Sequence, residues 1–146
     1  MLSKVSINRL LEAADILSTY KLPKGVKFDM TVFYKEPPSS KAPECGTAAC
    51  ACGIVASQPK IRKRGFTLVH SHYTKDDNGK RYSRLFTPKY KNKKGFHAVE
   101  LYFGINDEQA NDLFGAHNCD DTPKQVAKRI RQFVKQELKQ QSKQAA

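Results

Sequence analysis

The sequence predicts a single α+β domain, mainly helical, with a central helix of small residues and one projecting β-hairpin. Three observations carry this prediction. Apolar residues recur at helical spacing near both ends of the chain. Residues 45–53 hold three cysteines and otherwise only small side chains. Residues 76–79, Asp-Asp-Asn-Gly, form a strong hairpin-turn signal between two segments of strand-like composition. A length of 146 residues suits one domain, with four or five helices around residues 45–53.

The first predicted helix covers residues 3–20. Ser3 is suited to cap it, and Leu22-Pro23-Lys24-Gly25 ends it. One face collects the apolar side chains Ile7, Leu10, Leu11, Ala14 and Leu17. Residues 26–44 are less regular and predict either a strand or a short helical turn, followed by a proline-rich loop.

The central helix is predicted to begin with Thr47 as its N-cap and to end near Ser57, because Pro59 stops it. Cys50 then falls in the first turn, where the helix dipole favours a thiolate. The small side chains of this segment allow another element to approach its backbone closely. We therefore expect this helix to lie at the centre of the fold.

Strands are predicted at residues 66–73 and 80–87, which together form the hairpin at residues 66–87. Residues 96–103 have a composition compatible with a strand, but we predict a helix, because Gly104 fits a left-handed position at a helix end. Asn106 and Gln109 match the capping box of a following helix that ends at Gly115.

The last predicted helix covers residues 122–140, with Thr122 as cap, Pro123 at its first position and Gln125 completing a capping box. Its buried stripe consists of Val126, Ile130, Phe133, Val134 and Leu138. Its outer face carries many cations, namely Lys124, Lys128, Arg129, Arg131, Lys135 and Lys139. Residues 1–2 and 141–146 are expected to fray.

Basic charge is the strongest functional signal. The formal net charge is +12, and residues 60–94 alone hold twelve Lys or Arg and two Asp, a local charge of +10. Such an excess favours a polyanionic partner, so we expect nucleic acid (DNA or RNA) to bind through its phosphates without strong sequence specificity. The expected contacts are Arg62, Lys63, Arg64, Lys80, Arg81, Arg84, Lys91, Lys93 and Lys94.

This hypothesis requires cations of the hairpin, the following loop and the last helix to form one stripe. Nearby aromatic side chains would stack on unpaired bases, namely Tyr73, Tyr82, Phe86 and Tyr90. The alternative interpretation is a solvated basic exterior with these aromatics turned into the core. A second alternative partner is a host protein bound through one exposed face.

A cysteine-dependent hydrolase or transferase is a further alternative, with Cys45 or Cys50 as nucleophile and His97 as base. If residues 96–103 were a strand, the segment around His97 would be similar to the histidine strand of papain-like cell-wall amidases. Their Asp-Cys-Ser-Gly start is absent, because Glu44-Cys45-Gly46-Thr47 stands in its place. Buried cysteines that only pack are the simpler interpretation.

Metal binding is not expected, and neither is a cofactor. The available ligands are Cys45, Cys50, Cys52, His117 and Cys119, but no Cys-x-x-Cys pair occurs. Cys50 and Cys52 would lie about 200° apart if both were on a helix. This angle would keep them from sharing an ion.

Three segments resemble small uncharacterised proteins encoded by bacteria, phages and plasmids. They are Cys-Gly-Thr-Ala-Ala-Cys at residues 45–50, Glu-Leu-Tyr-Phe-Gly-Ile at residues 100–105 leading to Leu113-Phe114, and Thr-Pro-Lys-Gln-Val-Ala-Lys-Arg-Ile at residues 122–130. The resemblance covers most of the chain from Phe28 onward and implies a mainly helical, cytosolic accessory factor of a mobile element. Residues 1–9 lack a signal-peptide core, and no apolar run is long enough to cross a membrane. We therefore expect a cytoplasmic protein with reduced thiols.

Overall fold

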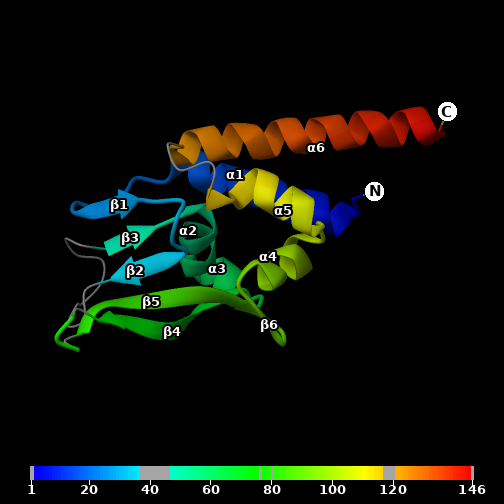
Figure 1. Cartoon of the computed structure of the whole chain (residues 1–146). Helices are drawn as coiled ribbons and strands as arrows, with labels where there is room; N and C mark the ends of the chain where they lie inside the picture. Colours follow the sequence, from blue (N-terminus) through cyan, green and yellow to red (C-terminus); the bar gives the residue numbers. More distant parts are fainter. Residues whose placement is uncertain (1, 37–46, 76, 80, 117–120, 146) are drawn as a thin grey trace.

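The structure, a computed structural model, describes residues 2–36, 47–75, 77–79, 81–116 and 121–145 (Figure 1). These residues form six helices: α1 (Lys4–Thr19), α2 (Ala51–Ser57), α3 (Pro59–Arg62), α4 (Phe96–Phe103), α5 (Asp107–Phe114) and α6 (Pro123–Ala145). They also form six strands: β1 (Val26–Phe28), β2 (Tyr34–Glu36), β3 (Thr47–Ala49), β4 (Thr67–Lys75), β5 (Arg81–Tyr90) and β6 (Lys93–Lys94). The predicted α+β fold is confirmed.

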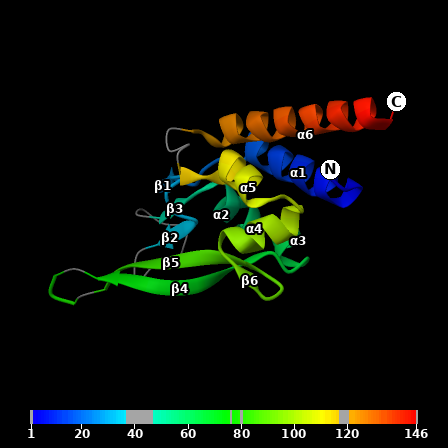
Figure 2. The same ribbon diagram turned by 45° about the vertical axis from the view of Figure 1, so that its right-hand side comes forward.

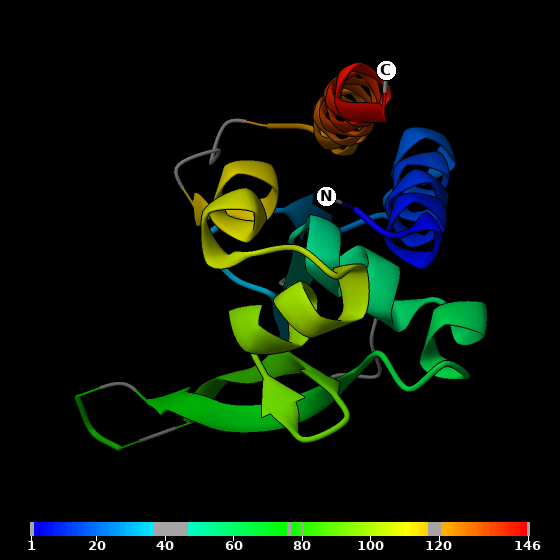
Figure 3. The same cartoon turned by 90° about the vertical axis from the view of Figure 1, so that its right-hand side faces the viewer.

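One mixed sheet joins all six strands in the order β1-β3-β2-β5-β4, and β6 adds to β5. Only the pairing of β1 with β3 is parallel. In Figures 1, 2 and 3, β4 and β5 lie at one extreme of the molecule and α6 lies at the other. The remaining helices lie between them. The helices therefore cover one side of the β4–β5 hairpin, which projects from the body in Figure 2.

The helix ends follow the local signals of the sequence. Ser3 Oγ accepts a hydrogen bond from the backbone N–H of Ser6 at 3.1 Å. Asn106 and Gln109 form the predicted capping box of α5. Gly104 has φ 67°, the left-handed conformation that ends α4. A capping box also precedes α6, where Thr122 and Gln125 bond to each other's backbone N–H at 2.7 and 3.2 Å.

The predicted start of the central helix is wrong. Thr47 opens strand β3, and Cys50 is the N-cap of α2 with an extended backbone, φ −89° and ψ −178°. Residues 47–49 lie between two neighbouring strands, β1 and β2, and bond to both. Backbone hydrogen bonds on both sides of the segment outweigh the single bond that a threonine cap would form. The end of the helix at Ser57 is as predicted.

The small side chains of α2 do allow a close approach, as predicted. A Cβ added at Gly53 would clash with the carbonyl oxygen of Phe33, in the loop before β2. The backbone N–H of Cys50 donates to the same oxygen at 3.1 Å. All residues from Ala51 to Ala56 are buried. Thus α2 occupies the centre of the core, directly behind the sheet.

Helix α6 extends further than predicted, to Ala145, and packs antiparallel to α1 (Figure 3). Arg131 of α6 bonds to Asp15 of α1 at 2.7 Å, whereas Gln141 bonds to the carbonyl of Leu2 at 3.1 Å. Two leucines differ from the predicted pattern: Leu11 was placed on the apolar face of the first helix and Leu138 in the buried stripe of the last, yet both are exposed in part. Leu11 is 36% exposed and Leu138 is 46% exposed.

Candidate nucleic-acid interface

Two of the predicted phosphate-contacting residues form ion pairs with carboxylates of other elements. Arg64, which follows α3, forms an ion pair with Glu12 of α1, and Lys60 approaches the same carboxylate at 3.5 Å. Arg84 of β5 forms an ion pair with Glu36 of β2, whose side chain is almost fully buried. Both arginines therefore join separate elements of the fold.

Five of the predicted contact residues, together with Lys89, lie at the end of the sheet where β4 begins and β5 ends. Lys89 is directly opposite Thr67 of β4 on one side and Lys94 of β6 on the other. Opposed residues of neighbouring strands point to the same face. Lys89, Lys94 and Thr67 therefore share one face of the sheet.

Two further cations lie beside Thr67 at the start of β4, Arg62 at the end of α3 and Lys63 directly after it. Arg62 and Lys63 line an open depression of about 370 Å³ together with Thr67 and Pro59. The lysines of the β5–β6 turn lie close to Lys89 along the chain, but Lys93 is opposite the buried Tyr90 and therefore points to the other face of the sheet. We call this set of cations the basic corner, and it consists of Arg62, Lys63, Lys89, Lys91, Lys93 and Lys94, all of them exposed.

The acidic groups of the described residues do not neutralise the basic corner. The ion pairs among the described residues lie outside the basic corner. They use the carboxylates Glu12, Asp15, Glu36, Glu100 and Asp121. None of these pairs includes a member of the basic corner. Six positive charges therefore lie around the start of β4 and the end of β5, on both faces of the sheet, without an ion-pair partner among the residues that the structure describes.

A buried tyrosine and a tight turn build the corner. Tyr90 is 8% exposed, and its ring lies 5.2 Å from that of Tyr102 in α4. Lys91 takes a left-handed backbone, φ 54°, and its ammonium lies 5.5 Å from the Tyr90 ring centroid. The turn that follows Tyr90 is thereby fixed to the core while its lysines face solvent.

The predicted stacking residues differ in their surroundings. Tyr90 belongs to the core, and Phe86 is half-buried, with its ring 5.6 Å from that of Tyr34 and 5.7 Å from that of His70. Tyr73 is half-buried, and its ring packs at a tilt of 57° against that of His70, with the ring centroids 4.7 Å apart. The side chain of Tyr82 lies outside the described residues. The three described rings pack against other rings of the fold, namely Tyr102, Tyr34 and His70, so the corner offers cations rather than a row of open aromatic faces.

The cations of the hairpin tip and of α6 are not part of the basic corner. Lys75 is at the far end of the hairpin, about 25 Å along β4 from Thr67 at the rise of a strand. Lys80 and the side chain of Arg81 lie outside the described residues. The lysines of α6 are on the opposite extreme of the molecule (Figure 1). Hairpin, loop and last helix therefore do not form one stripe.

Sequence reasoning missed one member of the corner, Lys89. It belongs to the same lysine-rich run as Lys91, and this run was the available signal. The predicted second strand ended at residue 87, whereas β5 continues to Tyr90. The extra residues pair Lys89 with β4 and thereby connect the turn to Arg62 and Lys63.

The structure does not bring the predicted thiol and imidazole together. Cys50 is 2% exposed, whereas the His97 side chain is 81% exposed with Nδ1 3.3 Å from Glu100. Cys50 borders a pocket of about 70 Å³, room for roughly two waters. Cys45, the other predicted nucleophile, lies outside the described residues.

The thiols of Cys50 and Cys52 interact with each other inside the core. Burial opposes ionisation of Cys50, but hydrogen bonds from the Cys52 thiol and the backbone N–H of Gly53 outweigh it, so its pKa is lowered. Burial raises the pKa of Cys52. The expected 200° separation does not apply, because Cys50 precedes the helix. The described residues include no cluster of three metal ligands, and His117 and Cys119 lie outside them.

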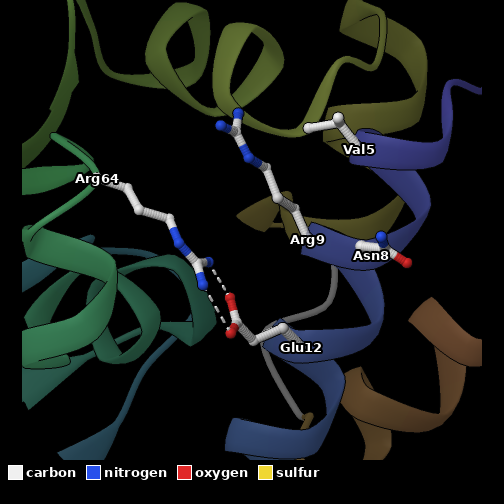
Figure 4. Close-up of a pocket in the computed structure, with 5 residues that line it drawn as sticks. All are labelled: Val5, Asn8, Arg9, Glu12 and Arg64. Carbon is white, nitrogen blue, oxygen red and sulfur yellow. Dashed lines mark hydrogen bonds and ion pairs between the residues drawn. The ribbon is translucent and has the colours of Figure 1, made fainter.

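A pocket lined mainly by polar side chains lies between α1 and the residues after α3 (Figure 4). It has a volume of about 230 Å³ and is lined by Val5, Asn8, Arg9, Glu12 and Arg64. Its arginines already have partners. Arg9 donates to the carbonyl of Tyr102 at 2.7 Å, and Arg64 is bonded to Glu12. Because these arginines bond to other parts of the protein, we infer that the residues of this pocket hold α1 against α4 and the turn after α3.

Comparisons with protein-family models, curated proteins and solved structures find no match to this chain. The resemblance to small phage and plasmid proteins therefore stays a prediction. Within the described ranges, every helix is too short or too polar to cross a membrane.

Proposed function

We propose that the protein binds nucleic acid through the phosphate backbone and that the basic corner is the contact surface. The observation that carries this proposal is the pairing of Lys89 with both Thr67 of β4 and Lys94 of β6, because Thr67 also lies beside Arg62 and Lys63. Cations from α3, β5 and β6 therefore lie at one end of the sheet. Such a surface attracts a polyanion and releases its counterions. In keeping with the resemblance, the protein would act as an accessory factor of a phage or other mobile element.

The kinds of side chain in the corner favour backbone contacts over base recognition. Five of the six are lysines, and lysine acts as a flexible point charge toward phosphates. The neighbouring helix α3 has only four residues, too few to enter a major groove as a recognition helix. We therefore propose binding without strong sequence preference.

The test measures fluorescence anisotropy of labelled oligonucleotides of about 20 nucleotides, as single strands and duplexes, between about 50 and 200 mM salt. The logarithm of the association constant should fall linearly with that of the salt concentration. Each phosphate neutralised adds about 0.7 to the slope for single strands and about 0.9 for duplexes. The triple variant K89E/K93E/K94E should bind at least about tenfold more weakly, with a slope smaller by about 2.

The matched control is K124E/K128E/K143E, which makes the same change of net charge on α6. Because α6 lies at the other extreme of the molecule, this variant should bind within about threefold of the wild type at physiological salt, where the screening length is about 8 Å. Equal losses in the two triple variants would show attraction by net charge alone and overturn the proposed site. Binding that is absent or independent of salt would reject the function itself.

A further inference from the structure

A second surface of different character lies between α1 and α6. Leu11, Val134 and Leu138 form an apolar floor in a depression of about 430 Å³, whose rim includes Arg131, Lys135, Lys139 and Ser142. Leu11 and Leu138 are 36% and 46% exposed, although both belong to the apolar faces of amphipathic helices. The two helices pack closely but leave these leucines uncovered.

Two hydrogen bonds between the helices flank the depression along α6. Arg131 bonds to Asp15 at one end, and Gln141 bonds to the Leu2 carbonyl at the other. From Arg131 to Gln141 the ten helical steps of about 1.5 Å span about 15 Å along α6. This length matches roughly three turns of a docked helix. Lys135 and Lys139 are one helical turn apart between these ends and therefore form a regular basic edge.

We propose that this groove docks an acidic amphipathic helix of a partner protein. Its leucine-type side chains would cover Leu11 and Leu138, and its carboxylates would pair with Lys135 and Lys139, which have no ion-pair partner among the described residues. Among the described residues, the carboxylate that forms an ion pair at this rim is that of Asp15, which is already bound to Arg131. Apolar floor and basic edge together select an occupant that is both apolar and acidic.

The same charges argue against two other occupants. A second copy would bring the basic edges of two chains together, each chain carrying a net charge of +12. Nucleic acid would pair with the lysines but leave the leucines exposed to water. The groove is also remote from the basic corner, so one chain can hold a nucleic acid and a protein helix at once (Figure 1).

The test uses a fluorescein-labelled helical peptide of about three turns, with leucines at i, i+4 and i+7 and glutamates on its flanks. A scrambled peptide of the same composition, whose leucines do not share a face, is the reference. The patterned peptide should bind at least about tenfold more tightly, and L138S and K135E/K139E should each remove most of this difference. Leu138 is partly exposed, so L138S is expected to fold, and circular dichroism checks this.

Two control variants sharpen the test. K124E/K128E makes the same charge change on α6 outside the groove and should keep the preference for the patterned peptide. K89E/K93E/K94E should keep it as well, which separates this proposal from nucleic-acid binding. Equal binding of both peptides, equal loss in K124E/K128E, or a dimer in light scattering that L138S dissociates would each overturn the proposal.

Discussion

Arg64 donates to both carboxylate oxygens of Glu12, a residue 52 positions earlier in the chain. Its Nη1 also lies 3.3 Å from the Tyr102 hydroxyl. One cation of the most basic segment thus joins three parts of the fold: α1, the turn after α3, and α4. The charge of Arg64 is used for structure, although its neighbours Arg62 and Lys63 face solvent.

This ion pair predicts a pH-dependent stability. The hydrogen bond from Arg64 lowers the pKa of Glu12 below its usual value near 4.5, against the opposing effect of partial burial. A lowered folded-state pKa stabilises the fold above the unfolded value, and this stabilisation is lost as pH falls through the folded value. Glu12→Gln should therefore cost about 1 kcal/mol at neutral pH, because the pair is partly screened by solvent. Urea denaturation from pH 7 to pH 3 measures the difference, which should shrink in acid. A difference that is constant over this range would show that the carboxylate charge does not contribute.

A second prediction separates structural from phosphate-binding cations. Arg64→Ala should lower the free energy of unfolding by about 1 kcal/mol but change oligonucleotide affinity less than Lys93→Ala does. Lys93→Ala should leave the midpoint of thermal unfolding nearly unchanged, because its side chain is exposed. Anisotropy titration and thermal unfolding of both variants test this. The reverse pattern would assign Arg64 to the interface and Lys93 to the fold.

A third prediction concerns the contact between α2 and the loop before β2. The new methyl of Gly53→Ala would overlap the backbone carbonyl of Phe33, which a rotation of a side chain cannot relieve. We expect a loss of about 3 kcal/mol or more in the free energy of unfolding. Gly79→Ala is the control, because nothing lies near its Cβ position, so it measures only the strain of φ 78°. If the two substitutions cost the same, α2 is not held against Phe33.

The parts of the fold that the sequence predicted are those with local signals. The caps at Ser3, Asn106 and Thr122 act on N–H groups within three residues, so the sequence contains both partners. The sheet β1-β3-β2 depends instead on pairings between strands of three residues each, too short to show alternation. Because the three residues of β3 show no strand pattern, the preference of threonine for N-cap positions predicted a helix start at Thr47.

The candidate surfaces follow the same division. The lysine run that includes Lys91, Lys93 and Lys94 is visible in the sequence, and the structure connects it to Arg62 and Lys63 through the pairing of Lys89 with Thr67. The carboxylate partners of Arg64 and Arg84 are distant in sequence, and no local pattern predicts them. The spacing of Leu11 and Leu138 places both on apolar faces, but whether a face is fully covered depends on how α1 and α6 pack.

The buried thiols lead to the last prediction. Cys50 and Cys52 are 2% and 0% exposed, so an alkylating reagent reaches them only when the core opens. The lowered pKa of Cys50 favours its thiolate, yet access limits the reaction. Iodoacetamide should modify both residues at least about a hundredfold more slowly in the native protein than in urea, as the equilibrium between closed and open states requires. Peptide mass spectrometry resolves each cysteine separately.

Gly53→Ala, which destabilises α2, should accelerate both reactions together. Rapid modification of Cys50 alone in the native protein, with a rate that rises through a pKa below that of an ordinary thiol, would instead restore the nucleophile hypothesis.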